Sequence, residues 1–191
     1  MPEAKVIRTT HRVVKPHATI ANISYCLDRH ANEHERGSAL FRMAGLVLEA
    51  FYVEGYATVV AENLGRSEEL MAVDGTKDRL KAIFKAADPE ADFGRRPYQT
   101  ILSLFRFRDR MAHPRVEELS EEKTLTSEEA DASIENVGWN VATETEAFCT
   151  KANALLVRQD VQMVVQRTWS TDWNGSPLDS GMQVVGHEYK G

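Results

Sequence analysis

Apolar residues recur at intervals of three and four positions along most of the chain, which is the spacing of one face of an α-helix. The pattern predicts helices over residues 18–36, 38–63, 77–87 and 97–112, and a long helix that starts near residue 126. Prolines and glycines stand at or near the ends of these segments, where they interrupt helices. The sequence therefore predicts an all-α fold, an antiparallel helical bundle of about five helices.

Each predicted helix has a side that we expect to face the core. The segment 38–63 is apolar on most sides, as expected of the central helix of a bundle. The inward stripe of the segment 18–36 is expected to contain Ile20, Ile23, Leu27, His30 and His34. The inward stripe of the long last helix is expected to contain Ile134, Val137, Val141, Phe148, Ala152 and Leu155.

The same pattern divides the chain into three parts. Residues 1–17 show little periodicity and are expected to form an N-terminal arm, residues 18–172 a single helical-bundle domain, and residues 173–191 a loose C-terminal tail. The chain has 191 residues, of which 42% are apolar and 27% charged. These values are typical of one soluble globular domain with short extensions.

Cysteine usage and hydropathy point to a cytoplasmic protein without a membrane segment. Cys26 and Cys149 lie far apart and have no metal-ligand spacing, so neither a disulfide framework nor a zinc site is indicated. The N-terminus lacks the continuous apolar stretch of a signal peptide. Residues 40–60 are long enough to cross a bilayer, but Arg42, Glu49 and Glu54 interrupt them, which favours a core helix.

The net charge is −6, which excludes a protein whose whole surface binds nucleic acid. The charge is unevenly distributed. Residues 95–115 contain six arginines and one aspartate, whereas residues 117–146 contain ten acidic residues and one lysine. The arginine-rich segment suits a phosphate-binding cleft. The alternative is that the two segments neutralise each other on neighbouring solvated faces.

One arginine of the segment 97–112 is predicted to point inward. At 100° per residue, Arg108 falls in the middle of the apolar face, whereas Arg106 and Arg110 fall on the opposite side. Burying an unpaired guanidinium costs several kcal/mol, so Arg108 needs a partner or a polar cleft. His113 precedes Pro114 and should end the helix, which would allow its imidazole to turn back toward Arg108.

An arginine and a histidine at such a helix end suit RNA cleavage without a metal ion or cofactor. Histidine can take the proton of a ribose 2′-OH near neutral pH, and arginine can stabilise charge on the phosphoryl oxygens in the transition state. The alternative is structural: Arg108 pairs with a core carboxylate and His113 merely ends the helix.

The string RDRMAHP, residues 108–114, resembles the R-x4-6-H signature of the HEPN superfamily (higher eukaryote and prokaryote nucleotide-binding domains), with Asp109 at the polar position after the arginine. The segment LEAFY, residues 48–52, is similar to a helix containing "EAF" in many bacterial members. The resemblance implies a helical bundle that forms a homodimer, so that two motifs face each other across one cleft. Active members are metal-independent RNases, often toxins of toxin–antitoxin pairs or phage-defence effectors.

The resulting hypothesis is an endoribonuclease whose substrate is RNA and whose partners include a second copy and, for a toxin, an antitoxin protein. His113 would act as general base or acid, Arg108 would stabilise the transition state, and Asp109 would orient one of them. Glu49 would hold the guanidinium of Arg108. The residues expected to bind RNA phosphates are Arg106, Arg110 and Arg115.

Two other hypotheses stay open. Some family members lack the motif and are binding or scaffold domains, so the chain is alternatively a non-catalytic module that binds a partner protein or a nucleotide. His30 and His34 are four residues apart on one predicted helix face, a spacing that allows two metal ligands, but the sequence offers no third. The alternatives for these two histidines are that they line the cleft or have a structural role. For Glu49, the alternative is a surface ion pair.

Overall fold

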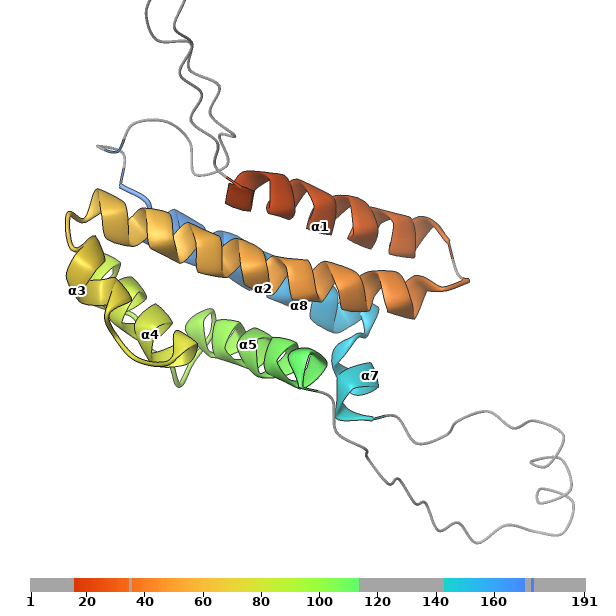
Figure 1. Cartoon of the computed structure of the whole chain (residues 1–191). Coiled ribbons are helices and arrows are strands. Elements are labelled where there is room, and N and C mark those ends of the chain that lie inside the picture. Colours follow the sequence, from red (N-terminus) through yellow and green to blue (C-terminus); the bar gives the residue numbers. More distant parts are fainter. Residues whose placement is uncertain (1–15, 35, 114–142, 171–172, 174–191) are drawn as a thin grey trace, which may run out of the picture.

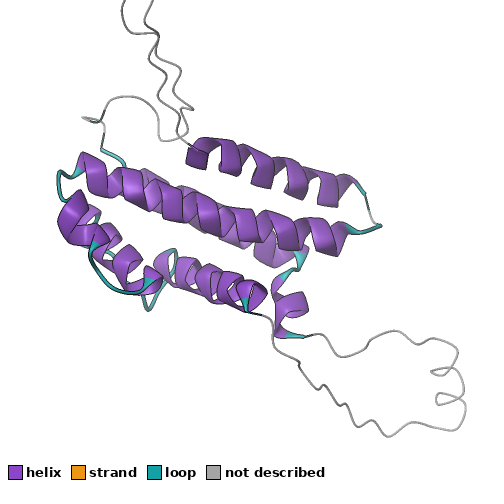
Figure 2. Ribbon diagram, in the orientation of Figure 1, coloured by secondary structure: helices purple, strands orange, loops and turns teal. Residues whose placement is uncertain are grey.

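The computed structural model describes residues 16–34, 36–113, 143–170 and 173. These residues form helices joined by loops and turns, without a β-strand among them (Figure 2). The all-α prediction is confirmed. The helices are α1 (Pro16–Glu33), α2 (Ser38–Asn63), α3 (Ser67–Met71), α4 (Thr76–Ala87), α5 (Tyr98–Ala112), α7 (Glu144–Phe148) and α8 (Lys151–Thr168).

Helix α2 is the centre of the bundle, as its all-round apolar sequence predicts. It contacts α1, α3, α4, α5 and α8, and Figure 1 shows α1 along one side of it and α4 and α5 along the other, with α8 behind. Its bounds agree with the predicted segment 38–63. Within the described residues α2 alone is long and apolar enough to cross a membrane, but half of its apolar window is buried in the bundle. That burial is what a core helix requires.

Helix α1 differs from its prediction in extent and in orientation. It spans residues 16–33, so residues 16 and 17 belong to the helix and not to an N-terminal arm. The predicted inward stripe is wrong at three of its five positions, because Ile23 is 47% exposed and His30 and His34 are exposed. The other two residues, Ile20 and Leu27, are partly buried, and Ile20 packs against the core. The residues that α1 buries are mostly small: His17, Ala18, Ser24 and Ala31.

Close packing of the two helix backbones explains this orientation. A Cβ atom at Gly45 of α2 would lie 3.5 Å from the carbonyl oxygen of Ser24, and one at Gly55 would lie 2.9 Å from Cβ of His17. Of these two contacts, only that at Gly55 is too short for a Cβ atom, whereas that at Gly45 has an ordinary van der Waals length, so Gly55 in particular lets α1 approach α2 closely. Ile23 is turned away from this contact, whereas Leu27 is partly buried beside Gly45.

The long last helix is interrupted. Helix α7 ends at Phe148, and the Thr150 hydroxyl accepts a hydrogen bond from the backbone N–H of Asn153 at 3.2 Å, which caps the start of α8. The interruption changes the register, so Ala152 and Leu155 are exposed and the predicted stripe is wrong there. The buried apolar residues of α8 are Ala154, Val157, Val161 and Val164. The predicted start near residue 126, with Ile134, Val137 and Val141, lies outside the described residues.

Two smaller features were not predicted. The five-residue helix α3 follows α2 directly after Gly65, which has a φ of 69° in the left-handed region. Trp173 was assigned to the C-terminal tail, but its ring packs edge-on against Trp169 with 5.1 Å between ring centroids. Residues 1–15 and 174–191, the rest of the predicted arm and tail, lie outside the described residues.

Candidate functional site

Helix α5 points one of its three arginines inward, as predicted. The side chain of Arg108 is 18% exposed, whereas Arg106 and Arg110 are exposed. The guanidinium carbon of Arg108 lies 5.1 Å from the ring centroid of Phe105 and 5.8 Å from that of Phe51. Contacts of this kind attract a cation to the face of an aromatic ring. They fix the guanidinium between α5 and α2.

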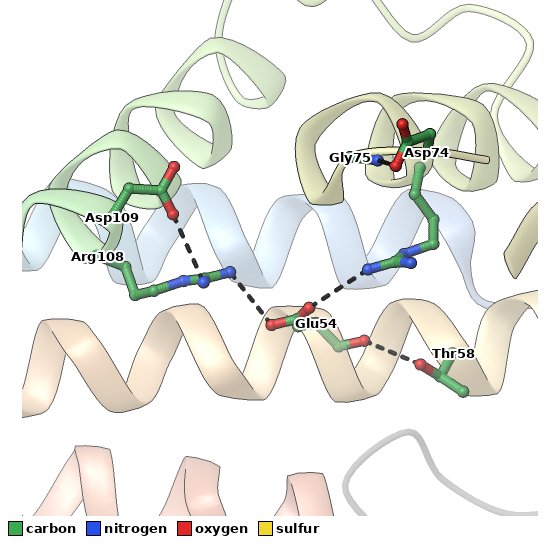
Figure 3. A network of polar contacts seen from close by, with 7 residues as sticks. Glu54, Thr58, Asp74, Gly75, Arg108 and Asp109 are labelled. Carbon is green, nitrogen blue, oxygen red and sulfur yellow. Dashed lines mark hydrogen bonds and ion pairs between the residues drawn. The ribbon is translucent and has the colours of Figure 1, made fainter. Parts of the chain in front are cut away.

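Two carboxylates pair with this guanidinium, and two further cations pair with the carboxylates. Arg108 lies 3.3 Å from Glu54 of α2 and 3.5 Å from its neighbour Asp109 (Figure 3). Glu54 also pairs with Arg79 at 3.8 Å, and Asp109 with Lys77 at 2.9 Å. We refer to these five residues, which come from α2, α4 and α5, as the Arg108 cluster. Sequence reasoning missed Lys77 and Arg79, because nothing in a helix pattern shows which residues a distant helix will meet.

The expected pairing of Glu49 with Arg108 is wrong, since Glu54 takes that place. Five residues of helix rotate a side chain by about 140°, so Glu49 and Glu54 face different neighbours of α2. Glu49 is 7% exposed and accepts a hydrogen bond from the hydroxyl of Ser24 at 2.7 Å. Burial raises the pKa of the Glu49 carboxyl, an effect that the Ser24 hydrogen bond partly offsets.

Glu49 lies instead at a groove of about 480 Å³ between α1 and α8. Arg158 of α8 also lines the groove, and its guanidinium carbon lies 5.5 Å from the ring centroid of Tyr25 on α1. The groove is separate from the Arg108 cluster, because its lining residues do not include any member of the cluster. The role predicted for Glu49 at the candidate active site is therefore not supported by its position.

His113 ends α5, as predicted, but does not turn back to Arg108. Its backbone has φ −130° and ψ 65°, and its N–H donates to the carbonyl oxygen of Asp109 at 3.0 Å. The imidazole is exposed, and among the described residues no hydrogen bond or ion pair joins it to Arg108. A site that uses both side chains would therefore need a second chain or a rearrangement of the helix end.

The other residues predicted for the site do not lie together as one group. Asp109 is half exposed and bridges Arg108 and Lys77. Arg110 pairs with Glu144 at the start of α7, so part of the acidic segment does neutralise part of the basic one. Arg106 is exposed on the outer face of α5. Arg115 lies outside the described residues.

The two histidines of α1 lie side by side at the surface. The ring centroids of His30 and His34 are 4.2 Å apart, and His30 packs edge-on against Phe41. In the described part of the chain, no three His, Cys, Asp or Glu residues are grouped so that they could hold a metal ion. The structure therefore adds no third ligand to this pair.

The outer face of α2 carries a strip of apolar side chains next to Arg108. The strip consists of residues spaced three or four apart: Leu40, Ala44, Leu48 and Phe51. Leu40 is 68% exposed and Phe51 is 41% exposed. Because Phe51 also contacts Arg108, this α2 strip is continuous with the Arg108 cluster. Exposed apolar surface of this kind is typical of an interaction site.

Comparisons with models of known protein families, with curated proteins and with solved structures found no match to this chain. The fold and the Arg108 cluster are therefore interpreted from their own geometry.

Proposed function

We propose that this protein is a cytoplasmic, metal-independent endoribonuclease of the HEPN type, active as a homodimer. The observation that carries the proposal is the position of Arg108. Its guanidinium is held by two aromatic rings and by long, partly exposed ion pairs, five residues before an exposed histidine at a helix end. An arginine of α5 that needed only to be solvated would lie on the outer face, as Arg106 does.

The chemistry needs a base, an acid and a positive charge at the phosphate. One His113 takes the proton of the ribose 2′-OH, and the 2′-oxygen attacks the adjacent phosphorus. The bond from phosphorus to the 5′-oxygen breaks, and a second histidine donates a proton to that oxygen. The products are a 2′,3′-cyclic phosphate and a free 5′-OH. Arg108 stabilises the charge on the phosphoryl oxygens, and Asp109 orients its guanidinium.

A second copy of the chain would supply the second histidine. Two observations support this: His113 does not contact Arg108 within one chain, and the α2 strip beside Arg108 is apolar and exposed. Pairing two α2 strips would bury apolar surface and place two α5 ends near each other. The exposed Arg106, together with Arg110 and Arg115, would bind phosphates of the flanking RNA. By resemblance, the biological role is that of a toxin, held by an antitoxin protein, or of a phage-defence effector.

The test is incubation of the purified chain with single-stranded and structured RNAs in the presence of EDTA. We expect cleavage that leaves 2′,3′-cyclic phosphate ends, lost in His113→Ala. Since the His113 side chain is exposed, this variant should fold. His34→Ala is the matched control, because it removes another exposed histidine and should cleave normally. Cleavage that survives His113→Ala would exclude the proposed site.

The second candidate is a non-catalytic interaction module, which the exposed α2 strip also favours. In that case Arg108 stabilises the α2–α5 contact, as its ion pairs with Glu54 and Asp109 allow. Folded protein that cleaves none of the RNAs, together with a dimer or partner complex that Phe51→Asp disrupts, would favour this function.

A further inference from the structure

Two of the arginine–carboxylate contacts among the described residues, Arg96–Asp160 and those of the Arg108 cluster, differ in how well the guanidinium group is bound. Arg96 donates two hydrogen bonds of 2.8 Å, from Nε and Nη2, to the two oxygens of Asp160. Asp160 is fully buried and accepts a third hydrogen bond, of 2.5 Å, from the hydroxyl of Thr100. This bidentate pair is satisfied and closed to solvent at the carboxylate, as expected of a structural contact.

The Arg108 cluster has the opposite character. Arg108 meets each carboxylate through one nitrogen only, at 3.3 Å and 3.5 Å, and Arg79 meets Glu54 at 3.8 Å. The side chains of Glu54 and Asp109 are 35% and 43% exposed. Nε of Arg108 is buried and has no hydrogen-bond partner among the described residues. Long, partly exposed ion pairs contribute little to stability and exchange readily for a better acceptor.

The charge and the donors around the cluster favour a phosphate group as that acceptor. Three cations, Lys77, Arg79 and Arg108, face two carboxylates, so the cluster has one positive charge in excess. Lys77 lies in the first turn of α4, a twelve-residue helix whose first N–H groups lack helical partners and receive no side-chain cap. Asp78 of the same turn is paired with Lys81, so this carboxylate is neutralised outside the cluster. A phosphate offers the planar guanidinium stronger, charge-assisted hydrogen bonds than the present single contacts.

We propose that Glu54 is the resident counter-ion of a phosphate-binding site formed by Arg79 and Arg108, with Lys77 at its edge, and that a backbone phosphate of RNA displaces it. Glu54 keeps the two guanidinium groups in place when the site is empty. The phosphate then takes over both guanidinium groups, and Glu54 turns to solvent. The inference rests on the proposed function only in taking RNA as the ligand. It assigns phosphate binding to Arg79 and Lys77 of α4, which lie outside the R-x4-6-H segment, and a counter-ion role to Glu54 of α2.

The experiment measures binding without cleavage. A fluorescein-labelled 2′-O-methyl oligonucleotide lacks the 2′-OH nucleophile, so fluorescence anisotropy with the full chain reports affinity alone. We expect Glu54→Gln to bind about three- to tenfold more tightly at low salt, because a competing carboxylate is removed while the shape is kept. Arg79→Ala should bind about three- to tenfold more weakly and reduce the slope of log K against log salt by about one.

The controls make the same charge changes at a distant ion pair. Arg66 and Glu69 form an exposed pair at the start of α3 with no member of the cluster. Glu69→Gln and Arg66→Ala should each change the affinity less than about twofold, which is the effect of net charge alone. A gain of affinity in Glu54→Gln cannot result from misfolding. The proposal is overturned if Glu54→Gln binds no more tightly than Glu69→Gln, or if the wild-type chain does not bind the oligonucleotide.

Failure of this inference can be distinguished from failure of the proposed function. If RNA cleavage is lost in His113→Ala but Glu54→Gln behaves like Glu69→Gln, the nuclease stands and the counter-ion role of Glu54 is refuted. If Glu54→Gln gains affinity but no variant cleaves RNA, the phosphate site stands and the nuclease is refuted.

Discussion

Replacement of Arg108 separates its contribution to packing from its contribution to chemistry. The side chain is mostly buried, its guanidinium lies over two aromatic rings, and it pairs with Glu54 and Asp109. Arg108→Ala removes the stem and the charge together. Arg108→Met removes the charge but keeps an unbranched stem of similar length between the same rings.

The expected costs follow from these contacts. Two partly desolvated cation–π contacts contribute about 1.5 kcal/mol, the two ion pairs together about 1 kcal/mol, and the buried methylenes about 2 kcal/mol. The side-chain entropy released by truncation returns about 1.5 to 2 kcal/mol. Arg108→Ala should therefore lower the free energy of unfolding by about 2.5 to 3 kcal/mol. Arg108→Met should lower it by about 1 to 1.5 kcal/mol, because sulfur–aromatic contacts replace part of the loss.

Urea unfolding followed by circular dichroism at 222 nm measures both values, and the RNA cleavage assay is run on the same preparations. The packing argument is refuted if Arg108→Met costs as much as Arg108→Ala, or if Arg108→Ala costs less than about 0.5 kcal/mol. A folded Arg108→Met variant that still cleaves RNA would show that the positive charge is not needed for catalysis.

Three further predictions concern the bundle. Burial raises the pKa of Glu49 above its ordinary value of 4.5, so the folded state binds this proton more tightly than the unfolded state does. The stability that the proton contributes is present below pH 4.5 and is lost as the pH rises through the folded-state pKa. Glu49→Gln should remove this pH dependence from urea unfolding midpoints measured between pH 4 and 8. Gly55→Ala places Cβ 2.9 Å from Cβ of His17 and should destabilise the α1–α2 contact by about 1 to 2 kcal/mol in urea unfolding. Phe107 is 1% exposed, and its ring stacks on that of Phe148 with 4.8 Å between centroids. Phe107→Ala should lower the free energy of unfolding by about 3 to 5 kcal/mol and the thermal midpoint by roughly 10 °C.

Each of these predictions has a matched control or a contradicting result. Gly45→Ala meets only ordinary van der Waals contacts, at 3.5 Å or more, and should stabilise α2 by about 0.5 to 1 kcal/mol through helix propensity; equal effects at Gly45 and Gly55 would contradict the packing described. A pH profile that is the same with and without Glu49 would contradict the raised pKa of its buried carboxyl group. A cost below about 1 kcal/mol for Phe107→Ala would mean that α7 does not pack on α5.

Much of the fold follows from local sequence signals. The bounds of α2, α4 and α5 agree with prediction to within one residue, because apolar periodicity and terminal glycine or proline residues act over a few positions of the chain. The face that α1 buries was not predictable in this way, since Ile23 is as apolar as any core residue. The burial of mostly small residues of α1 accompanies its close approach to α2 at Gly55, and that approach depends on two helices at once. The break between α7 and α8 at Thr150 also has a local cause, the capping hydroxyl of Thr150. A single threonine is a weaker sequence signal than the apolar pattern that continues on both sides of it.

The sequence by itself determined the all-α class, the central place of α2 and the inward direction of Arg108, because each depends on helical periodicity alone. Only the tertiary structure decided which side chains meet that guanidinium. It selected Glu54 over Glu49, brought Lys77 and Arg79 from α4, and left His113 without a contact to Arg108. The physical reason is that a helix repeat fixes the direction of a side chain relative to its own axis, whereas ion pairs require the relative placement of separate helices, which is set by packing of the whole core.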